Sequence, residues 1–310
     1  MGTEQAKKDI DVAIILLTLN QGDKTIRCLT SLQAVTGPDF RIMLWDNGSS
    51  DNTIADVRAN FPDVLTHHHP ENAGVAAGRN MAVNFLRQRY APRYLLFLDN
   101  DMTVEADFLE HLMAPFAADE KIAQTTAKIL DMGNPRRLYG AGGCRVRFWL
   151  GDTTHNGYGE MDRGQYDSVR QCLPSGGCML VRAAVFDELA GFTTVYDPYG
   201  PEDLDFGMRV TKAEYYGLFV PEAVVYHESR PGRTFEGGAY TSQFAANRVR
   251  NWFTFMRRHA SPGQKLGFYL IGIPVLLAGF VRRQARRGVL LSSLKSLAAG
   301  IYNYLRGVGK

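Results

Sequence analysis

The stretch Tyr94–Met102, with the sequence Tyr-Leu-Leu-Phe-Leu-Asp-Asn-Asp-Met, decides the fold. Its five leading apolar residues, preceded by Pro92, predict a strand buried on both faces, which is typical of a parallel sheet. The strand stops at Asp99 and Asp101, and in open α/β sheets ligands bind beyond the carboxyl ends of the strands. Because neighbouring carboxylates repel each other unless a cation or a donor lies between them, this edge is a candidate site for Mg²⁺ or Mn²⁺. The alternative is a polar turn in which Asp99 caps the next helix.

The composition is that of an ordinary globular protein. Of the 310 residues, 45% are hydrophobic and 22% are charged, and the net charge of +3 is too small to indicate a nucleic-acid partner. The first eleven residues are polar and do not resemble a signal peptide. Four cysteines without a close CxxC pair, Cys28, Cys144, Cys172 and Cys178, indicate reduced thiols. We therefore expect a cytoplasmic protein.

Apolar strand-like segments alternate with helical segments through the first hundred residues, which predicts βαβ units and a mostly parallel sheet flanked by helices. The expected strands lie at 12–19, 40–45, 64–68 and 94–98, and the expected helices at 23–34 with Asp23 as N-cap, at 53–60, and from about Asn80 to Tyr90. Further strands are expected at 123–129, before Arg182 and at 218–226, and further helices at 108–118, 183–189 and from Glu202. Residues 131–164 are expected to form a long irregular insert or hairpin where acceptor specificity could lie.

Polar signals follow three of these strands, at Thr18–Asn20, Asp46–Ser50 and Asp99–Asp101. Since parallel strands end at one edge of the sheet, we expect the three segments to face the same edge. A carboxylate such as Asp46 could accept the N3–H of a uracil or thymine ring, although it serves equally well as a turn residue.

A glycine-containing segment, Gly74–Gly78, opens the third helix. It predicts free backbone N–H groups and a positive dipole end for a diphosphate, with Arg79 adding charge, or else only a tight strand-to-helix connection. The neighbouring run His67–His69 is expected to be an exposed loop rather than a metal site, because adjacent side chains of a strand point in opposite directions.

A second group of carboxylates begins at Glu202 and Asp203, in the first turn of a predicted helix, where the helix dipole favours negative charge. Asp205 and Arg209 are spaced as a structural i,i+4 pair. A lone histidine, His227, ends the last predicted strand, and such residues are more often structural than metal ligands.

Taken in order, these segments resemble the inverting family 2 glycosyltransferases of GT-A (Rossmann-like) fold, in particular the rhamnosyltransferase-like and galactofuranosyltransferase-like members. The resemblance covers roughly residues 10–255. It is carried by Thr18-Leu19-Asn20, Asp46 to Asp51, Asn72 to Asn80, the DxD-type motif Asp99-Asn100-Asp101, Ser175 to Arg182, Gly191-Phe192, and Glu202 to Arg209.

The resemblance implies a role for each matching position. The donor-binding positions would be Thr18, Asn20, Asp46 (at the nucleobase), Asn72, Gly78, Arg79, Asp99 and Asn100. The metal ligands would be Asp99, Asp101 and His227, the last of these 24 positions after the catalytic base, Asp203. The acceptor-binding positions would be Gly176, Gly177 and Glu202.

The implied reaction is a metal-dependent, inverting transfer of a sugar from a UDP- or dTDP-sugar to a hydroxyl of a glycan or lipid-linked glycan. The metal, Mg²⁺ or Mn²⁺, neutralises the leaving diphosphate, while Asp203 takes the proton of the acceptor hydroxyl. Two alternatives stay open. One is a HAD-type phosphohydrolase with Asp99 as nucleophile and Asp101 as acid/base. The other is a non-catalytic nucleotide-sugar binding module.

The C-terminal part differs in character from the rest. We expect a catalytic domain at 1–230, and a lid loop with basic amphipathic helices at 231–310. The apolar stretch 266–281 is slightly short for a membrane span, and it is followed by Arg282, Arg283, Arg286 and Arg287. This pattern favours peripheral contact with the inner face of the cell membrane over packed helices or a true span, and a homodimer is a further alternative.

Overall fold

The computed structural model describes residues 7–174, 177–228 and 242–306. It divides into two compact units. The first, here called the sheet unit, comprises 1–144, 155–198 and 202–229, and the second, the helical unit, comprises 145–154, 199–201 and 230–310.

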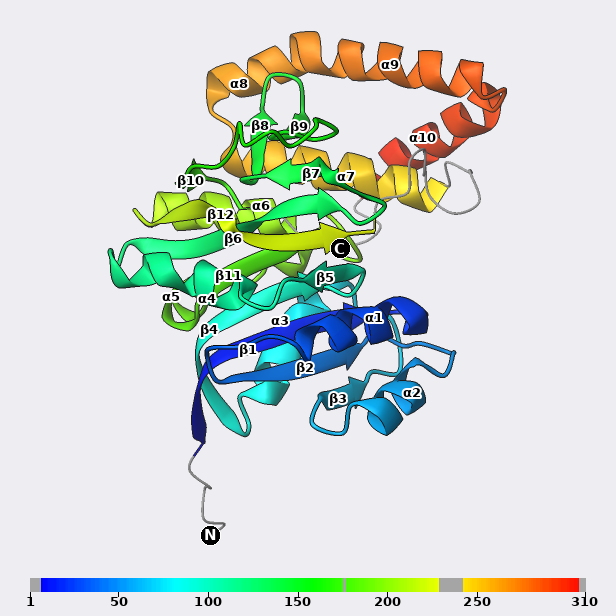
Figure 1. The fold of residues 1–310 in the computed structure, drawn as a ribbon. Helices are drawn as coiled ribbons and strands as arrows, with labels where there is room; N and C mark the ends of the chain where they lie inside the picture. Colours follow the sequence, from blue (N-terminus) through cyan, green and yellow to red (C-terminus); the bar gives the residue numbers. More distant parts are fainter. Residues whose placement is uncertain (1–6, 175–176, 229–241, 307–310) are drawn as a thin grey trace. The chain divides into compact units, whose positions relative to one another are not determined.

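The sheet unit is built on a ten-stranded sheet whose main path runs β10-β12-β6-β11-β4-β1-β2-β3, with β5 paired to β12 and β7 to β6 (Figure 1). The strands are β1 (Lys8–Thr18), β2 (Phe40–Asp46), β3 (Leu65–His68), β4 (Tyr90–Asp99), β5 (Met102–Val104), β6 (Ile122–Asp131), β7 (Asn134–Ala141), β10 (Arg170–Cys172), β11 (Cys178–Arg182) and β12 (Tyr216–His227). Parallel pairing joins β4, β1, β2 and β3, and also β6 and β12, whereas β11 lies antiparallel between β4 and β6. The predicted mostly parallel α/β sheet is confirmed.

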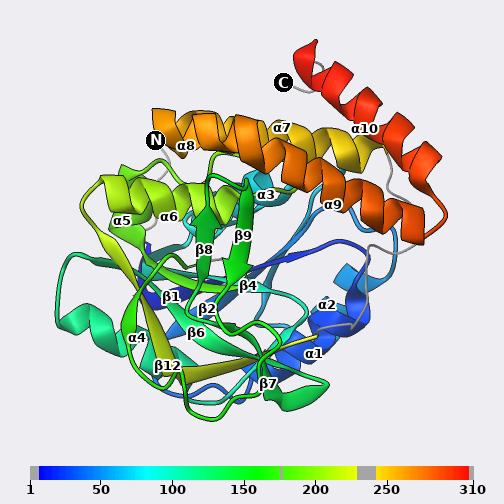
Figure 2. The same ribbon diagram turned by 90° about the horizontal axis from the view of Figure 1, so that it is seen from above.

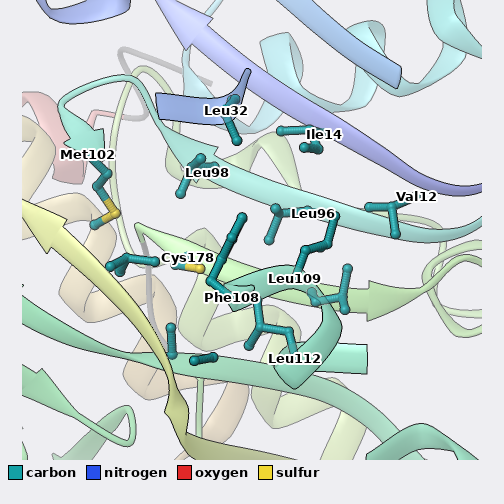
Figure 3. Packing of buried hydrophobic residues seen from close by; sticks show 14 of the residues in the cluster. Val12, Ile14, Leu32, Leu96, Leu98, Met102, Phe108, Leu109, Leu112 and Cys178 are labelled. Atoms are coloured by element: carbon teal, nitrogen blue, oxygen red, sulfur yellow. The ribbon is translucent and has the colours of Figure 1, made fainter. Parts of the chain in front are cut away.

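Helices cover both faces of this sheet, which explains the continuous apolar runs of its central strands. The helices are α1 (Gly22–Leu32), α2 (Thr53–Asn60), α3 (Val75–Leu86), α4 (Phe108–Met113), α5 (Ala183–Glu188) and α6 (Glu202–Lys212), with 3-10 turns η1 (Ala114–Ala117) and η2 (Thr194–Tyr196). Alternate β1 residues face opposite sides: Ile14 packs in a core with α1 and α4, and Ile15 packs in another with α3 and α5. Figure 3 shows the first of these cores around Ile14, Leu96 and Phe108.

Two local predictions are wrong. Helix α1 begins at Gly22, so Asp23 lies in its first turn and Gln21, not Asp23, is the N-cap. Helix α3 ends at Leu86 and β4 already begins at Tyr90, so Pro92 lies inside the strand rather than before it. The strand tolerates this proline because β11 pairs only with residues 94–98 of β4, which leaves Pro92 beyond that ladder.

The expected insert at 131–164 begins as a hairpin, since β7 pairs antiparallel with β6. A separate two-stranded sheet follows, formed by β8 (Cys144–Arg147) and β9 (Asp152–His155). The tip of this second hairpin, residues 145–154, belongs to the helical unit.

The helical unit contains α7 (Ser242–His259), α8 (Pro262–Gly267), a π-helical turn η3 (Phe268–Gly272), α9 (Ile273–Arg286) and α10 (Leu290–Leu305) (Figure 2). Phe268 is buried against the hairpin tip, where a Cβ added to Gly151 would lie 2.2 Å from its ring. The π-helical turn precedes Pro274, which lacks the N–H of a regular helical residue, and π turns are a common way to absorb such an interruption.

Residues Pro262–Arg286 form one helical stretch of 25 residues, with an 18-residue window of mean hydropathy 1.6 that is 17% buried. By length and composition this stretch is able to cross a membrane. The core helices of some soluble proteins have the same length and composition. The expectation that the apolar segment is slightly short for a span is therefore wrong, because the helix extends beyond residues 266–281 at both ends.

Candidate active site

The three polar strand ends lie at one edge of the sheet, as predicted. In the parallel registers of β1, Thr18 is opposite Asp46 of β2, and Leu17 is opposite Asp99 of β4. The chain leaves each of these strands at the same level, so the loops that follow them lie side by side.

Asp99, Asp101 and His227 converge at this edge. Each offers one ligand atom, and the three atoms lie within 4.8 Å of one another, with His227 Nε2 3.4 Å from Asp101 Oδ1. The convergence follows from strand pairing, because β5 begins one residue after Asp101 and its Met102 pairs with His227 of β12. Two carboxylates and an imidazole form a donor set that suits Mn²⁺, and the carboxylate oxygens also suit Mg²⁺.

The electrostatics of this cluster fit a cation. The pKa of Asp101 is raised, first by burial and then by the charge of Asp99, while His227 and Lys24 act in the opposite direction. The Lys24 ammonium lies 3.6 Å from Asp101 Oδ2. Ionising both aspartates in this half-buried place is costly, and a divalent cation would offset that cost.

A second layer of residues fixes His227. Its ring stacks on Tyr139 at 4.1 Å between centroids, and the next residue, Glu228, pairs with Arg27 and Lys24 of α1. The Glu228 backbone N–H also donates to the Asp101 carbonyl at 3.0 Å. Sequence reasoning missed this layer, although the i,i+3 spacing of Lys24 and Arg27 and the position of Glu228 beside His227 were available signals.

Arg79 links the metal-ligand candidates to the second group of carboxylates. From α3, its buried guanidinium contacts Asp99 Oδ1 at 2.9 Å and Glu202 Oε1 at 3.2 Å. Asp203 follows in the first turn of α6, half-buried, and accepts the Leu204 N–H at 2.7 Å. The predicted structural pair of Asp205 and Arg209 is confirmed at 2.8 Å. Arg79 therefore lies between two carboxylates rather than in an open phosphate pocket.

Glu202, an expected acceptor contact, is 6% exposed and faces Arg79. Burial raises its pKa to about 8, the charge of Asp203 adds to this effect, and Arg79 opposes it. A glutamate in the unfolded chain titrates near 4.5, so between these two pH values the folded protein binds one proton more than the unfolded chain. The folded state therefore loses stability relative to the unfolded state as the pH rises through this window.

We expect the Glu202→Gln variant to lack this loss. Its free energy of unfolding relative to the wild type should rise steadily between about pH 5 and pH 8, because glutamine has no proton to release. Urea unfolding at several pH values measures the difference. Glu110→Gln, at an exposed carboxylate of α4, is the matched control and should follow the wild type. Parallel profiles for wild type and Glu202→Gln would contradict the raised pKa.

The N-terminus of α3 is closed by a carboxylate from a distant part of the chain. Asp197 accepts the Ala76 N–H at 2.9 Å and the Ala77 N–H at 3.1 Å, and the Val75 N–H donates to the Pro198 carbonyl at 2.9 Å. A Cβ on Gly74, whose φ is +96°, would lie 2.4 Å from Asp197 Cγ. The expectation that this segment offers free N–H groups to a diphosphate is wrong, since Asp197 occupies the dipole end.

Asn72 and Gly78 shape the same loop. Asn72 Oδ1 accepts hydrogen bonds from Asn47 Nδ2 at 2.9 Å and from the Gly74 N–H at 3.0 Å. A Cβ on Gly78 would lie 3.0 Å from a Leu17 methyl group, so glycine permits α3 to approach β1 closely. Asn72 is exposed at the edge, whereas Gly78 is buried.

The Asp46 carboxylate is buried and has three hydrogen-bond partners. It accepts the Ser49 N–H at 3.0 Å and the Ser49 hydroxyl at 2.5 Å, and His68 Nδ1 lies 2.6 Å from its other oxygen. His67 stacks on Trp45 on the opposite face of β3, at 4.3 Å between centroids. The expectation that 67–69 is an exposed loop is wrong for these two histidines, which are residues of β3.

Thr18 and Asn100 belong to a buried polar network. Asn100 Nδ2 donates to Thr25 Oγ1 at 2.9 Å and to Thr18 Oγ1 at 3.3 Å, which ties the turn after β4 to β1 and α1. Both side chains are therefore buried below the exposed edge of the sheet and hold the turn after β4 in place.

Asn20, by contrast, is exposed at the edge, with a φ of +52°. Its N–H donates to Ser49 Oγ and its Oδ1 accepts the Ser50 N–H, each at 2.8 Å. Gly177, with φ +91°, accepts the Asp99 N–H at 2.8 Å, and a Cβ there would lie 2.3 Å from Met102 Cε. Gly176, the other expected acceptor-binding glycine, lies outside the described residues.

Comparison with known proteins gives a consistent result. The model of the family described as "Glycosyl transferase family 2" matches residues 13–190, which is more than half of the chain. The chain is 25% identical over 231 residues to the pre-mycofactocin glycosyltransferase of Mycobacterium tuberculosis, a match that covers 71% of this chain but only 43% of that protein. It is 22% identical over 264 residues to the N-acetylglucosaminyl-diphospho-decaprenol L-rhamnosyltransferase of the same species, covering 80% and 84% of the two chains.

Two solved structures share the fold. GalNAc-T7, solved with UDP, GalNAc and Mn²⁺, has a TM-score of 0.62 at 17% identity, over 77% of this chain and 47% of that chain. The mannosyltransferase PcManGT from Pyrobaculum calidifontis, solved with GDP-Man and Mn²⁺, has a TM-score of 0.56 at 15% identity, over 97% and 88%. These similarities identify the sheet and its helices as a GT-A fold.

Proposed function

The chain belongs to glycosyl transferase family 2, and from this premise we propose that it is a metal-dependent inverting glycosyltransferase using a UDP- or dTDP-sugar. The observation that carries the proposal is the convergence of Asp99, Asp101 and His227, joined through Arg79 to the helix turn that holds Asp203. Family membership removes the basis for the phosphohydrolase alternative, which would leave the α6 carboxylates without a role.

Each residue has a proposed task. Asp99, Asp101 and His227 would hold Mg²⁺ or Mn²⁺, which when bound supplies positive charge to the leaving nucleoside diphosphate. Asp203 accepts the proton of the acceptor hydroxyl as that oxygen bonds to the anomeric carbon and the carbon–phosphate oxygen bond breaks, with inversion. Arg79 orients Asp99 and the first turn of α6 through its two ion pairs.

In this proposal the remaining predicted positions line or support the sites for the donor and the acceptor. The donor lies along the exposed edge formed by Asn20, Asn72 and the Asp46 loop, supported beneath by Thr18 and Asn100. The acceptor hydroxyl approaches beside Gly177, and Glu202 acts on the acceptor site indirectly by holding the first turn of α6.

A thermal-shift panel tests the proposal. UDP, dTDP, GDP, CDP and CMP are each added with Mn²⁺ and with EDTA, because a ligand that binds only the folded state raises the melting temperature. We expect a metal-dependent rise with UDP or dTDP. A family 2 enzyme of a different donor class would respond to GDP or CDP instead, and no metal-dependent response to any nucleotide would contradict the proposal.

We also propose that the acceptor is lipid-linked and that the helical unit contacts the inner face of the cell membrane. One relative is named for a decaprenyl-diphosphate-linked substrate. The helical unit exposes apolar side chains along α8–α9, at Leu266, Leu270, Ile271, Val275, Leu277 and Val281. Four exposed arginines end this stretch, at 282, 283, 286 and 287. An apolar stripe followed by cationic side chains suits an anionic bilayer surface.

Replacing these four arginines by alanine should weaken membrane binding. Each basic residue near an anionic surface contributes about 1 kcal/mol, so the fraction bound to anionic vesicles should fall at least tenfold, and binding to neutral vesicles should change little. Vesicle flotation at low and high salt measures this. The control removes the same charge from the sheet unit, at Arg89, Arg93, Arg136 and Arg163, which are exposed. An equal loss of vesicle binding in both quadruple variants would contradict a role specific to the helical unit. Vesicle binding by the wild type that persists at high salt would favour a membrane span, and salt-independent self-association would favour a homodimer.

A further inference from the structure

A series of three aromatic rings leads from the metal-ligand cluster to solvent. Tyr139 of β7 stacks on His227 at 4.1 Å between centroids, and Tyr158 contacts Tyr139 at 5.6 Å with the two rings inclined by 75°. Burial raises the pKa of Tyr139 to about 12, and Tyr158 and the charge of Asp101 add to this shift. Tyr158, at the outer end of the series, is 65% exposed. An aromatic side chain is therefore presented to solvent beside the cluster, and neither metal binding nor proton transfer uses it.

The turn that carries Tyr158 is anchored to β7 on both sides of the tyrosine. On one side the Ala141 N–H donates to the Asn156 carbonyl at 2.8 Å, and on the other the Gly159 N–H donates to the Leu138 carbonyl at 2.9 Å. Backbone hydrogen bonds of this kind hold the turn in one position relative to the strand. An aromatic ring on an anchored turn loses little conformational freedom when a ligand binds, which favours recognition.

The same turn begins beside the candidate base. Its first residue, His155, accepts the Tyr158 N–H at 3.4 Å through its carbonyl. The surrounding protein lowers the pKa of the His155 imidazole, and the charge of Asp203 opposes this shift, so the imidazole lies near that carboxylate. His155, Tyr158 and Asp203 all belong to the sheet unit. The turn is therefore near the base at one end and near the metal-ligand cluster at the other.

An inverting transfer places the acceptor in this interval, because its hydroxyl must lie between the base and the anomeric carbon of the metal-bound donor. We propose that Tyr158 is the platform for the acceptor, and that the group carrying the accepting hydroxyl is a neutral sugar ring stacked on this tyrosine. The inference rests on the proposed function, because it names the acceptor class of that reaction.

The chemistry of the platform distinguishes a sugar from a phosphate as the accepting group. A sugar ring has an apolar face of C–H groups that packs on an aromatic ring, while its hydroxyls remain at the rim for hydrogen bonds and for deprotonation. A lipid phosphate has no such face, and it would bring negative charge next to Asp203. The platform therefore favours the sugar end of a glycan or lipid-linked glycan.

Saturation-transfer NMR tests this inference on the full chain with Mg²⁺ and UDP or dTDP. The probes are the methyl glycosides of glucose, galactose, N-acetylglucosamine and rhamnose, with methyl phosphate as the phosphate probe. We expect at least one glycoside to bind, with the strongest saturation on the C–H protons of one ring face, and methyl phosphate to show none. Tyr158→Ala should weaken the binding of that glycoside about tenfold, the effect of losing one aromatic stacking contact. Tyr158→Phe keeps the ring and should bind it within about twofold of the wild type.

The control variant is Tyr215→Ala, which removes a tyrosine that directly precedes β12, at the end of that strand opposite His227, and whose hydroxyl donates to Glu188 at 3.0 Å. It should bind the glycoside as the wild type does. The nucleotide protons report donor binding in the same samples and should be saturated equally in all variants.

The outcomes separate this inference from the proposed function. If the nucleotide binds but no glycoside does, if Tyr158→Ala binds the glycoside as tightly as the wild type, or if Tyr158→Phe loses it, the inference is overturned while the transferase proposal stands. Saturation of methyl phosphate in place of the glycosides would overturn it in favour of a phosphate acceptor. If no nucleoside diphosphate binds, both the inference and the proposed function are overturned.

Discussion

Replacing Asp203 by asparagine should reduce sugar transfer by about two to four orders of magnitude, the usual contribution of a positioned general base. Asparagine keeps the size of the side chain and can still accept the Leu204 N–H, so the first turn of α6 is expected to remain intact. It cannot take a proton from the acceptor hydroxyl. Initial rates with a donor sugar and acceptor measure the loss, and the Mn²⁺-dependent thermal shift with the donor nucleotide should be unchanged.

The matched control for this variant is Asp187→Asn, at an exposed carboxylate of α5 that pairs with Arg87. It should retain full transfer activity. Transfer at the wild-type rate in Asp203→Asn would remove Asp203 from the role of base. Loss of both transfer and nucleotide binding would instead indicate that Asp203 supports the donor site.

The Asp101→Asn variant should lose the metal-dependent response altogether. The change removes one of the two negative charges of the cluster, so we expect the Mn²⁺-dependent shift with nucleotide to disappear and transfer to fall at least a hundredfold. Stability should move in the opposite direction. Since burial and the neighbouring Asp99 raise the pKa of Asp101, its ionised form is disfavoured in the folded state above the usual titration range of aspartate. At neutral pH without metal, the variant should therefore melt no lower than the wild type.

The diagnostic result is the combination of lost metal response and transfer with a melting temperature, measured without metal, that is no lower than that of the wild type. The control is Asp107→Asn. Asp107 directly precedes α4, and its exposed carboxylate pairs with His111. This variant should change neither the melting temperature nor the Mn²⁺-dependent response. An Asp101→Asn variant that melts well below the wild type without metal would show that Asp101 is mainly a structural partner of Lys24 and His227. A retained Mn²⁺ shift would show that the cation binds elsewhere.

The sequence predicted those features that depend on short segments. The apolar run before Asp99 identified β4 as a buried strand, and the polar residues after β1, β2 and β4 identified a common edge, because strand periodicity and strand ends are local properties. The convergence of His227 with the two aspartates was expected from the family resemblance alone, since no local signal reveals that β12 and β5 pair.

The features that sequence reasoning missed are contacts between distant segments. Nothing near Arg79 indicates that Asp99 and Glu202 take up its charge, and nothing near Asp46 indicates that the pairing of β2 with β3 covers its carboxylate with His68. In both cases the residue type was correctly identified as chemically important. Its exposure and its partners depend on packing, which the local pattern does not contain.

The Asp197 cap of α3 has a consequence for how the domain acquires its structure. The hydrogen bonds that satisfy the first turn of α3 join residues that are 120 and 121 positions apart in the sequence. The ribosome therefore synthesises all of α3 long before it reaches Asp197. Contacts of such high sequence separation form late, because the intervening chain must first be ordered. A nascent chain that ends before Asp197 should therefore hold α3 in a frayed state, and protection of the Ala76 and Ala77 amides from hydrogen exchange should appear only when the β11–α6 region has docked.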